Sequence, residues 1–216
     1  MKPEEVIKLL ERSNALLTGH FQLSSGLHSD RYAQCALAFL DPRDGGVLGQ
    51  AIADKFRGRG IDLVAGPALG GIIPAYEVAR GLGVPCIFSE RQEGVMTIRR
   101  GFSLKPGQKV LLVEDVITTG KSASELAGLV VKAGAVVAGV GCVADRSKGK
   151  SMLPVKVEGL VELDFSTYKQ ESCPLCASGS KAVKPGSRPS GGTPDGRSRP
   201  AVQSTAGADR PSGGKN

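Results

Sequence analysis

Two kinds of apolar segment alternate along most of the chain. Short aliphatic and β-branched runs, typical of buried strands, are separated by longer segments in which apolar residues recur every three or four positions, as in amphipathic helices. Strands separated by helices predict an α/β fold with a mostly parallel sheet, which binds ligands beyond the carboxyl ends of its strands. The expected strands are 62–65, 84–88, 110–113, 135–143 and 159–165, and the expected helices are 3–17, one from Asp41-Pro42 to Gly58–Gly60, 72–81 and 121–132.

The N-terminal region has a different pattern. Residues 3–17 are expected to form one amphipathic helix, because their large aliphatic residues share one side. Residues 20–36 contain a Ser/Gly turn flanked by alternating polar and apolar positions, which is typical of a β-hairpin. The helix's apolar side would hold Val6, Ile7, Leu9, Leu10 and Leu16.

The segment from Val110 to Ser122 joins an apolar strand to a polar loop. Val110 to Val113 has no polar interruption, as expected for a strand buried on both faces. Glu114 and Asp115 follow, and a loop of small hydroxyl and glycine residues then opens a helix. A helix N-terminus favours a phosphate, which two carboxylates would repel. The combination is consistent if the acids face sugar hydroxyls or a hydrated Mg²⁺, so the segment indicates a site for a phosphorylated ribose.

Two other interpretations compete for this segment. A solvated strand-to-helix turn would carry similar polar residues without binding any ligand. The end of a GxxxxGK[ST] phosphate loop would also read Gly-Lys-Ser here, but the position of its first glycine is held by Asp115. The order of strand, acids and loop favours the ribose phosphate site.

Two further segments lie at expected strand ends. Residues 66–71 (GPALGG) would allow a backbone to approach a ligand closely, or form a plain turn. Asp145-Arg146 follows strand 135–143. The guanidinium of Arg146 offers a planar fork for one carboxylate, or could pair with Asp145 at the surface.

Composition changes sharply near residue 181. Residues 181–216 are rich in Gly, Pro and Ser and have almost no large aliphatic residues, so we expect a disordered tail. This tail carries most of the formal net charge of +7. The charge is therefore weak support for nucleic-acid binding by the remaining domain, 1–180.

The cysteines and the lengths of the apolar runs indicate in which cellular compartment the protein is expected. No run approaches the roughly 20 residues that span a bilayer, and the N-terminus does not resemble a signal peptide. Cys35, Cys86 and Cys142 lie in apolar stretches, which predicts reduced thiols in the cytoplasm. Cys173-Pro-Leu-Cys176 is half of a zinc site that no second pair or nearby histidine completes. We therefore expect structural or incidental thiols there, and neither a metal site nor a redox pair.

The strand, acids and Thr/Gly loop resemble the phosphoribosyl diphosphate (PRPP) signature of type I phosphoribosyltransferases. Residues 19–32 (GHFQLSSGLHSDRY) look like the N-terminal hood of orotate phosphoribosyltransferases within that family. Residues 89–102 stand where these enzymes carry a mobile flap. The resemblance implies the type I fold, with a central mostly parallel sheet flanked by helices, a hood of about 1–36 and a core of about 37–170.

The resemblance also implies an activity, the transfer of a phosphoribosyl group from PRPP to orotate in pyrimidine synthesis. Glu114 and Asp115 would be catalytic, bonding the ribose hydroxyls and stabilising positive charge on the ring. Mg²⁺ would be held through PRPP and water and not by direct protein ligands. Arg91 would reach PRPP across the interface of a homodimer, and Thr118 and Arg146 would bind orotate. The PRPP site would comprise Glu114, Asp115, Val116, Ile117, Thr118, Thr119, Gly120, Lys121, Ser122 and Arg91.

This chain departs from the family pattern in its cations. The flap has neither the usual lysine nor the usual histidine, so Arg91, Arg99 and Arg100 are its only cations. Leu69-Gly70 replaces the lysine of the pyrophosphate loop, and Ser24 replaces that of the hood. The hood histidines, His20 and His28, are expected to make packing or polar contacts and not to act as general bases.

Two alternative functions remain open at this point. A phosphoribosyltransferase for a purine or another base would share residues 114–122 but would not need a carboxylate fork at Arg146. A regulator could keep the fold as a PRPP sensor and use the basic tail on nucleic acid, although the tail lacks aromatic residues for base stacking.

Overall fold

The computed structural model describes residues 1–23, 25–153 and 155–185, which form one folded unit, Met1–Pro185. Ser24 and the predicted tail from residue 186 onward lie outside the described residues. Residues 181–185, which the composition assigned to the tail, belong to the folded unit. Among the described residues, no helix combines the length and the apolar character needed to cross a membrane.

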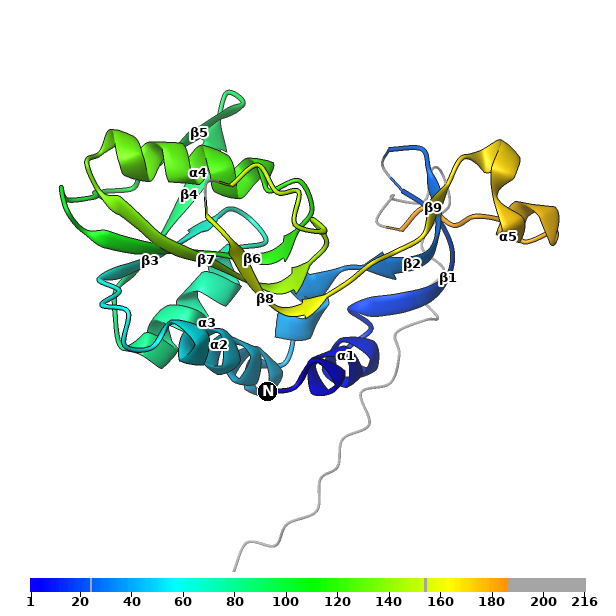
Figure 1. Cartoon of the computed structure of the whole chain (residues 1–216), viewed down its shortest axis with the longest axis horizontal. Helices are drawn as coiled ribbons and strands as arrows, with labels where there is room; N and C mark the ends of the chain where they lie inside the picture. The colour runs from blue at the N-terminus through cyan, green and yellow to red at the C-terminus, as the bar shows by residue number, and fades with distance from the viewer. Residues whose placement is uncertain (24, 154, 186–216) are drawn as a thin grey trace, which may run out of the picture. The chain divides into compact units, whose positions relative to one another are not determined.

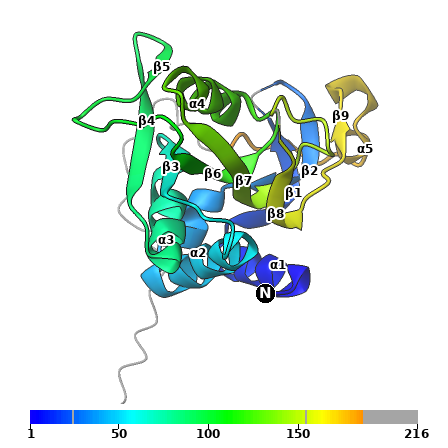
Figure 2. The ribbon, with the colours of Figure 1, turned by 60° about the vertical axis from the view of Figure 1, so that its left-hand side comes forward.

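A six-stranded sheet forms the centre of the folded unit (Figures 1 and 2). Its neighbouring strands run parallel, except that β5 is antiparallel to β4 at one edge. This confirms the predicted α/β class with a mostly parallel sheet. In spatial order the strands are β5 (Val95–Thr97), β4 (Cys86–Gln92), β3 (Leu63–Pro67), β6 (Lys109–Ile117), β7 (Val136–Asp145) and β8 (Val157–Glu162).

The apolar run in β6 has the predicted burial on both faces. Val110, Leu111, Leu112 and Val113 are completely buried. Successive side chains of a strand point to opposite faces. Leu111 and Val113 accordingly join one apolar cluster, and Val110 and Leu112 join the other. The strand continues beyond the predicted end at residue 113 to Ile117, so Glu114 and Asp115 lie within its carboxyl-terminal half.

Helices cover both faces of this sheet. Helices α2 (Pro42–Phe56) and α3 (Ile72–Leu82) pack together on one face, and α4 (Lys121–Lys132) lies on the other (Figures 1 and 2). The predicted start of α2 is confirmed, because the Asp41 carboxylate accepts a hydrogen bond from the Arg43 N–H at 2.9 Å. Such N-caps satisfy an otherwise unpaired donor of the first helical turn.

The first helix is shorter than the amphipathic pattern predicted. Helix α1 spans Pro3–Arg12 and not 3–17, and strand β1 (Leu16–Gln22) begins soon after it. Leu16 is buried in the core as expected, but it belongs to strand β1 and not to the helix. The apolar pattern continued past the end of the helix because both elements pack on the same cluster, so periodicity alone could not locate the boundary.

The predicted polar loop at 89–102 is in part a hairpin. Strand β4 extends to Gln92 and pairs with β5, and the two residues between them, Glu93 and Gly94, both have positive φ. Two-residue turns of this kind match the twist of antiparallel strands. The flap is therefore an extension of the sheet edge for at least half its length.

A second, three-stranded sheet forms the hood, which we define by strands β1, β2 (His28–Ala33) and β9 (Thr167–Tyr168) (Figure 1). The chain returns to it after β8 through η2 (Gln170–Ser172) and α5 (Pro174–Ala177), and η1 (Cys35–Phe39) leads from β2 toward α2. The Val183 backbone then bonds to His20 and Gln22 of β1 at 2.8 Å. The hood therefore contains residues from both ends of the folded unit and not only from 1–36.

Candidate active site

The predicted phosphate loop, residues 118–122, lies where β6 ends and α4 begins. A cavity of about 120 Å³ opens there. Gly120 has φ 75°, and a Cβ at this position would lie 3.3 Å from the Leu153 side chain, so glycine suits both the turn and the space. The lining residues are Glu114, Val116, Ile117, Thr118, Thr119, Gly120, Lys121 and Ser122.

Neighbouring backbone holds this loop in place. The Thr119 carbonyl accepts a hydrogen bond from the Met152 N–H at 2.9 Å, and the Thr119 hydroxyl accepts one from the Lys121 N–H at 3.3 Å. The first N–H groups of a helix have no partner within it and carry partial positive charge. The cavity at the start of α4 therefore has the size and polarity of an anion site.

Glu114 and Asp115, the acid pair, occupy the same end of β6 and are half-buried. Burial raises the pKa of Glu114 to about 8, and the neighbouring Asp115 carboxylate adds to this effect. Burial also raises the pKa of Asp115, against a hydrogen bond donated by the Val116 N–H at 2.8 Å. Two acids held this way favour a cationic or hydroxyl-bearing partner.

The glycine loop, residues 66–71, meets the acid pair as its position at a neighbouring strand end predicted. A Cβ on Gly70 would lie 2.8 Å from a carboxylate oxygen of Asp115. A Cβ on Gly66 would lie 2.2 Å from the Gly71 carbonyl oxygen, so both ends of the loop require the absence of a side chain. Leu69, which stands where the family has lysine, is 85% exposed.

Arg146 follows β7 at the same sheet edge, because its N–H donates to the Ile117 carbonyl at 2.7 Å. Its guanidinium carbon lies 4.3 Å from the centre of the Phe165 ring. The predicted alternative, a pair with Asp145, is wrong: Asp145 accepts instead from the Ser147 N–H at 2.8 Å. Within the described residues Arg146 has no carboxylate partner, and its buried Nε has no hydrogen-bond partner.

The Cys35 thiol is close enough to both Asp115 and Arg146 to feel their charges. Burial raises the pKa of the Cys35 thiol to about 12, with a further increase from the charge of Asp115 and a decrease from that of Arg146. Burial lowers the pKa of Arg146 itself. A half-buried guanidinium without a salt-bridge partner in the described part of the chain, at the sheet edge that also carries the acid pair and the anion cavity, is suited to a ligand that carries its own carboxylate.

The flap arginines are all held by acids of the same chain. Arg91 pairs with Glu125 of α4 and donates to the Gly94 carbonyl at 2.8 Å, while Arg99 and Arg100 both pair with Glu90. The structure therefore places no flap cation at the phosphate loop of its own chain, and the predicted role of Arg91 in PRPP binding stays a prediction.

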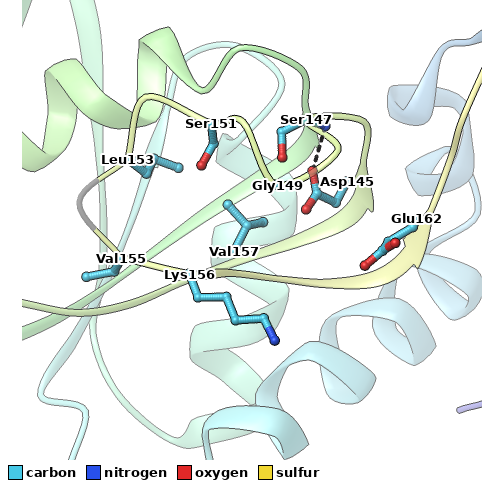
Figure 3. Close-up of a pocket in the computed structure, with 9 residues that line it drawn as sticks. All are labelled: Asp145, Ser147, Gly149, Ser151, Leu153, Val155, Lys156, Val157 and Glu162. Atoms are coloured by element: carbon cyan, nitrogen blue, oxygen red, sulfur yellow. Dashed lines mark hydrogen bonds between the residues drawn. The ribbon is translucent and has the colours of Figure 1, made fainter.

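A larger cavity of about 380 Å³ lies between the loop after β7 and strand β8 (Figure 3). Asp145 and Glu162, which are paired in the β7–β8 register, lie at one end of this cavity. Lys156, which directly precedes β8, also lines it. Its lining contains none of the predicted site residues. The site predicted from sequence is thus the smaller cavity at the phosphate loop.

The sequence missed one cluster of chemically active side chains. His20 and His28 of the hood lie beside Cys173 and Cys176 in the folded chain. The expectation that no nearby histidine accompanies the CxxC pair is therefore wrong. No local signal linked the two segments, because they are far apart in the chain.

Comparison with known proteins agrees with this geometry. Residues 45–157 match the model of the phosphoribosyl transferase domain. Orotate phosphoribosyltransferase from Pelotomaculum thermopropionicum is 50% identical over 188 residues, which are 87% of this chain and 99% of that protein. The chain belongs to the orotate phosphoribosyltransferase family.

Other family members support this assignment at the level of sequence and of fold. The orotate phosphoribosyltransferase of Thermotoga maritima is 49% identical over 181 residues, covering 84% of this chain and 97% of that protein. The structure of Mycobacterium tuberculosis H37Rv orotate phosphoribosyltransferase in complex with inorganic phosphate is 27% identical and covers 74% of this chain and 94% of that one, with a TM-score of 0.61. The predicted type I fold is therefore confirmed.

Proposed function

We propose that this family member transfers the 5-phosphoribosyl group of PRPP to orotate, giving orotidine 5′-phosphate and pyrophosphate in pyrimidine synthesis. The observation that carries the choice of orotate is the guanidinium of Arg146, which lies at the same sheet edge as the acid pair and has no salt-bridge partner among the described residues. Orotate carries a carboxylate that uracil and the purines lack. A purine would leave this half-buried cation unpaired, at a cost in binding free energy.

Each part of the site has a role in this reaction. The phosphate loop binds the 5′-phosphate through the N–H groups at the start of α4 and the hydroxyls of Thr118, Thr119 and Ser122. The acid pair accepts hydrogen bonds from the two ribose hydroxyls. Nitrogen N1 of orotate attacks C1 of PRPP while the bond from C1 to the pyrophosphate oxygen breaks, and its electron pair leaves with pyrophosphate.

Electrostatics supply the stabilisation that this reaction needs. The transition state has positive charge on the ribose ring, next to Glu114 and Asp115. Positive charge there favours the ionised carboxylates, whose pKa values are raised when the site holds no cation. Positioned negative groups that meet charge as it develops are the main contribution to many enzymatic rates. No general base is required, because an orotate dianion is already nucleophilic.

Mg²⁺ fits this donor set and is part of the proposal. Carboxylate oxygens, phosphates and water are its preferred partners, and a bound cation would favour the ionised form of the two half-buried acids, whose pKa values burial raises. When bound through PRPP and water, Mg²⁺ would neutralise charge on the leaving pyrophosphate. The acid pair would orient its water ligands.

The proposal also includes a homodimer and a cytoplasmic location. In the family pattern the leading flap cation serves the neighbouring subunit, and Arg91 would take that role after exchanging Glu125 for a diphosphate. All five cysteines, each within the described residues, are free thiols, which is consistent with a reducing compartment.

The test is product identification. The protein is incubated with PRPP, Mg²⁺ and orotate, uracil, hypoxanthine or adenine in separate reactions, with Asp115→Asn as the matched control. Orotidine 5′-phosphate should be the main product, and pyrophosphate should appear in equal amount. A preference for a purine would refute the choice of orotate and keep PRPP, whereas PRPP binding without any turnover would indicate the regulator.

A further inference from the structure

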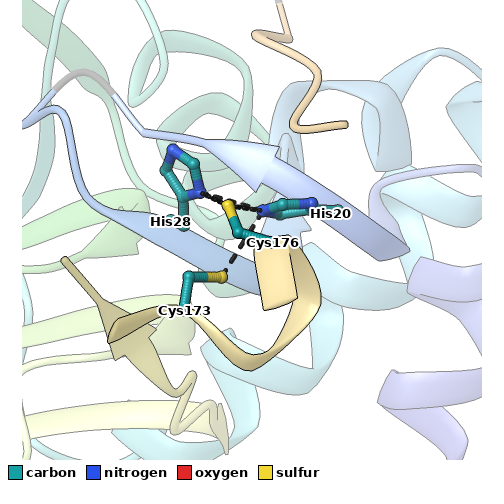
Figure 4. A group of neighbouring side chains, drawn as sticks. All are labelled: His20, His28, Cys173 and Cys176. Atoms are coloured by element: carbon teal, nitrogen blue, oxygen red, sulfur yellow. Dashed lines mark hydrogen bonds between the residues drawn. The ribbon is translucent and has the colours of Figure 1, made fainter. Parts of the chain in front are cut away.

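Four potential metal ligands converge in the hood (Figure 4). His20 comes from β1 and His28 from β2, while Cys173 directly precedes α5 and Cys176 lies within it. One ligand atom from each lies within 4.8 Å of all the others. We call these residues the His₂Cys₂ cluster.

The distances within the cluster approach those of a tetrahedral zinc site. Nε2 of His20 lies 2.9 Å from Nδ1 of His28 and 3.5 Å from Sγ of Cys173. Sγ of Cys176 lies 3.2 Å from Nδ1 of His28 and 3.7 Å from Nε2 of His20. Zn–N bonds of about 2.0 Å and Zn–S bonds of about 2.3 Å place tetrahedral ligand atoms about 3.3 to 3.8 Å apart, so small side-chain shifts would admit the ion.

The tautomer of His20 is set by a backbone contact. Its Nδ1 lies 3.1 Å from the Ser180 carbonyl oxygen, which can only accept, so Nδ1 carries the proton. The lone pair of the neutral ring is then on Nε2 and faces the other three ligands. Metal-binding histidines commonly donate their second N–H in this way, which fixes the ring orientation.

Hydrogen bonds alone do not explain why these polar side chains are buried together. His20, His28 and Cys173 are 7%, 4% and 3% exposed. Two histidines and two thiols in such a place can share only a few weak hydrogen bonds, and none of the four residues belongs to either apolar core cluster. Two thiolates would instead balance the charge of one divalent zinc ion.

We propose that His20, His28, Cys173 and Cys176 bind one Zn²⁺ ion as a closed structural site. Two sulfur and two nitrogen ligands in a tetrahedron select zinc among common divalent ions and leave no open position for catalysis. The ion links the β1–β2 hairpin to the C-terminal segment of the folded unit. In a small lobe outside the main core, a metal replaces the stabilisation that apolar burial supplies elsewhere.

The site is connected to the candidate active site through two short segments. Strand β2 leads from His28 toward η1, whose first residue, Cys35, is close enough to Asp115 and Arg146 to feel their charges. The segment before β9 starts at Phe165, beneath the Arg146 guanidinium, and its Ser166 carbonyl accepts from the Ser29 hydroxyl at 2.9 Å. Zinc would therefore hold in place both segments that flank the arginine.

The first experiment measures metal content in the full chain, purified without a histidine tag. Mass spectrometry of the metal should find about one zinc per chain. Cys176→Ser and His28→Ala should retain less than a tenth of that amount, and the matched control Cys86→Ser, a half-buried thiol outside the cluster, should retain all of it. Zinc that is absent from the wild type, or kept by both cluster variants, would overturn the proposal.

A second experiment does not depend on variants that fold. Unfolded wild type is refolded with Co²⁺, whose tetrahedral thiolate complexes absorb in the visible range, and the spectrum is compared with that of the Cys86→Ser control. Both should show the same thiolate–cobalt bands, and added zinc should remove them. Removal of the metal by a chelator should lower the Tm of both proteins by several degrees. Absent bands together with an unchanged Tm would refute a structural metal.

Discussion

The phosphate loop and the His₂Cys₂ cluster are both polar sites, but the chain builds them differently. The acids and loop occupy consecutive positions from 114 to 122, whereas His28 and Cys176 are separated by 148 residues. The first site lies on the rigid central sheet, between two apolar clusters. The second lies in the hood, outside both clusters. The proposed catalytic site thus lies on the best-packed element, whereas the four proposed metal ligands lie outside both apolar clusters.

The two sites also have opposite effects on stability. The acid pair is held in surroundings that raise its pKa values, so ionisation there disfavours the folded state until a ligand arrives. Zinc in the hood would instead favour the folded state, because the unfolded chain lacks a formed site. The four predictions that follow test this contrast, from the largest expected effect to the smallest.

The largest effect is expected from Asp115→Asn. Loss of one negative charge next to the ribose should lower turnover about 10²-fold or more, the range for removal of a preorganised electrostatic group. The Tm should not fall, since burial of the carboxylate is itself unfavourable. Steady-state kinetics with orotate and PRPP measure the effect, and near wild-type turnover in a folded protein would remove Asp115 from the catalytic site.

Arg146→Ala should weaken orotate binding strongly. Loss of hydrogen bonds to a charged group costs about 1.5–3 kcal/mol, so the KM for orotate should rise roughly 10- to 150-fold while PRPP affinity changes much less. Arg146→Lys is the matched control and should recover only part, because it keeps the charge and loses the planar fork. Equal losses for orotate and PRPP would mean that Arg146 supports the site only through its packing on Phe165.

Glu114→Gln should change the pH dependence of stability. The folded-state pKa of about 8 lies above the ordinary value of 4.5, so the folded protein binds this proton more tightly than the unfolded chain. The contribution of Glu114 is therefore most favourable below pH 4.5, falls as the pH rises to about 8, and is constant above. The Tm of Glu114→Gln relative to wild type should rise across this window, by about 2–4 °C for each kcal/mol.

The matched control for this titration is Glu11→Gln, which changes an exposed carboxyl group of α1. Its Tm difference from wild type should stay flat over the same range of pH. A flat difference for Glu114→Gln as well would show that the acid pair is not held in destabilising surroundings.

The smallest effect is expected from truncation after Pro185, which removes residues 186–216, the part of the predicted disordered tail that lies outside the folded unit. Tm, activity and zinc content should all stay near wild-type values. Truncation after Gly179 is the sharper comparison, because it also removes the Ser180 carbonyl that orients His20 and the Val183 backbone that pairs with β1. Zinc affinity should then fall about 10-fold or more, the usual range for loss of a group that hydrogen-bonds a metal-binding histidine.

Two outcomes would contradict the results expected from these two truncations. A salt-sensitive affinity for nucleic acid that disappears with residues 186–216 would favour the regulator. Equal zinc affinity in both truncated proteins would show that Ser180 does not orient His20.

The sequence was sufficient where function and fold depend on neighbouring residues. The run from Val110 to Val113 predicted a doubly buried strand, and the loop that follows predicted the start of α4 at residue 121. The order of these elements places Glu114, the glycine loop and Arg146 at one edge, since the carboxyl ends of parallel strands meet there.

The tertiary structure decided what depends on contacts between distant segments. Helix α1 ends at Arg12, and the flap forms a hairpin because β4 pairs with β5. Arg146 does not pair with Asp145, whose carboxylate accepts a hydrogen bond from the Ser147 N–H instead. The His₂Cys₂ cluster is the clearest case. A metal site requires four ligand atoms around one point, and only the return of the chain from β8 to the hood brings Cys173 and Cys176 to histidines that precede them by some 150 residues.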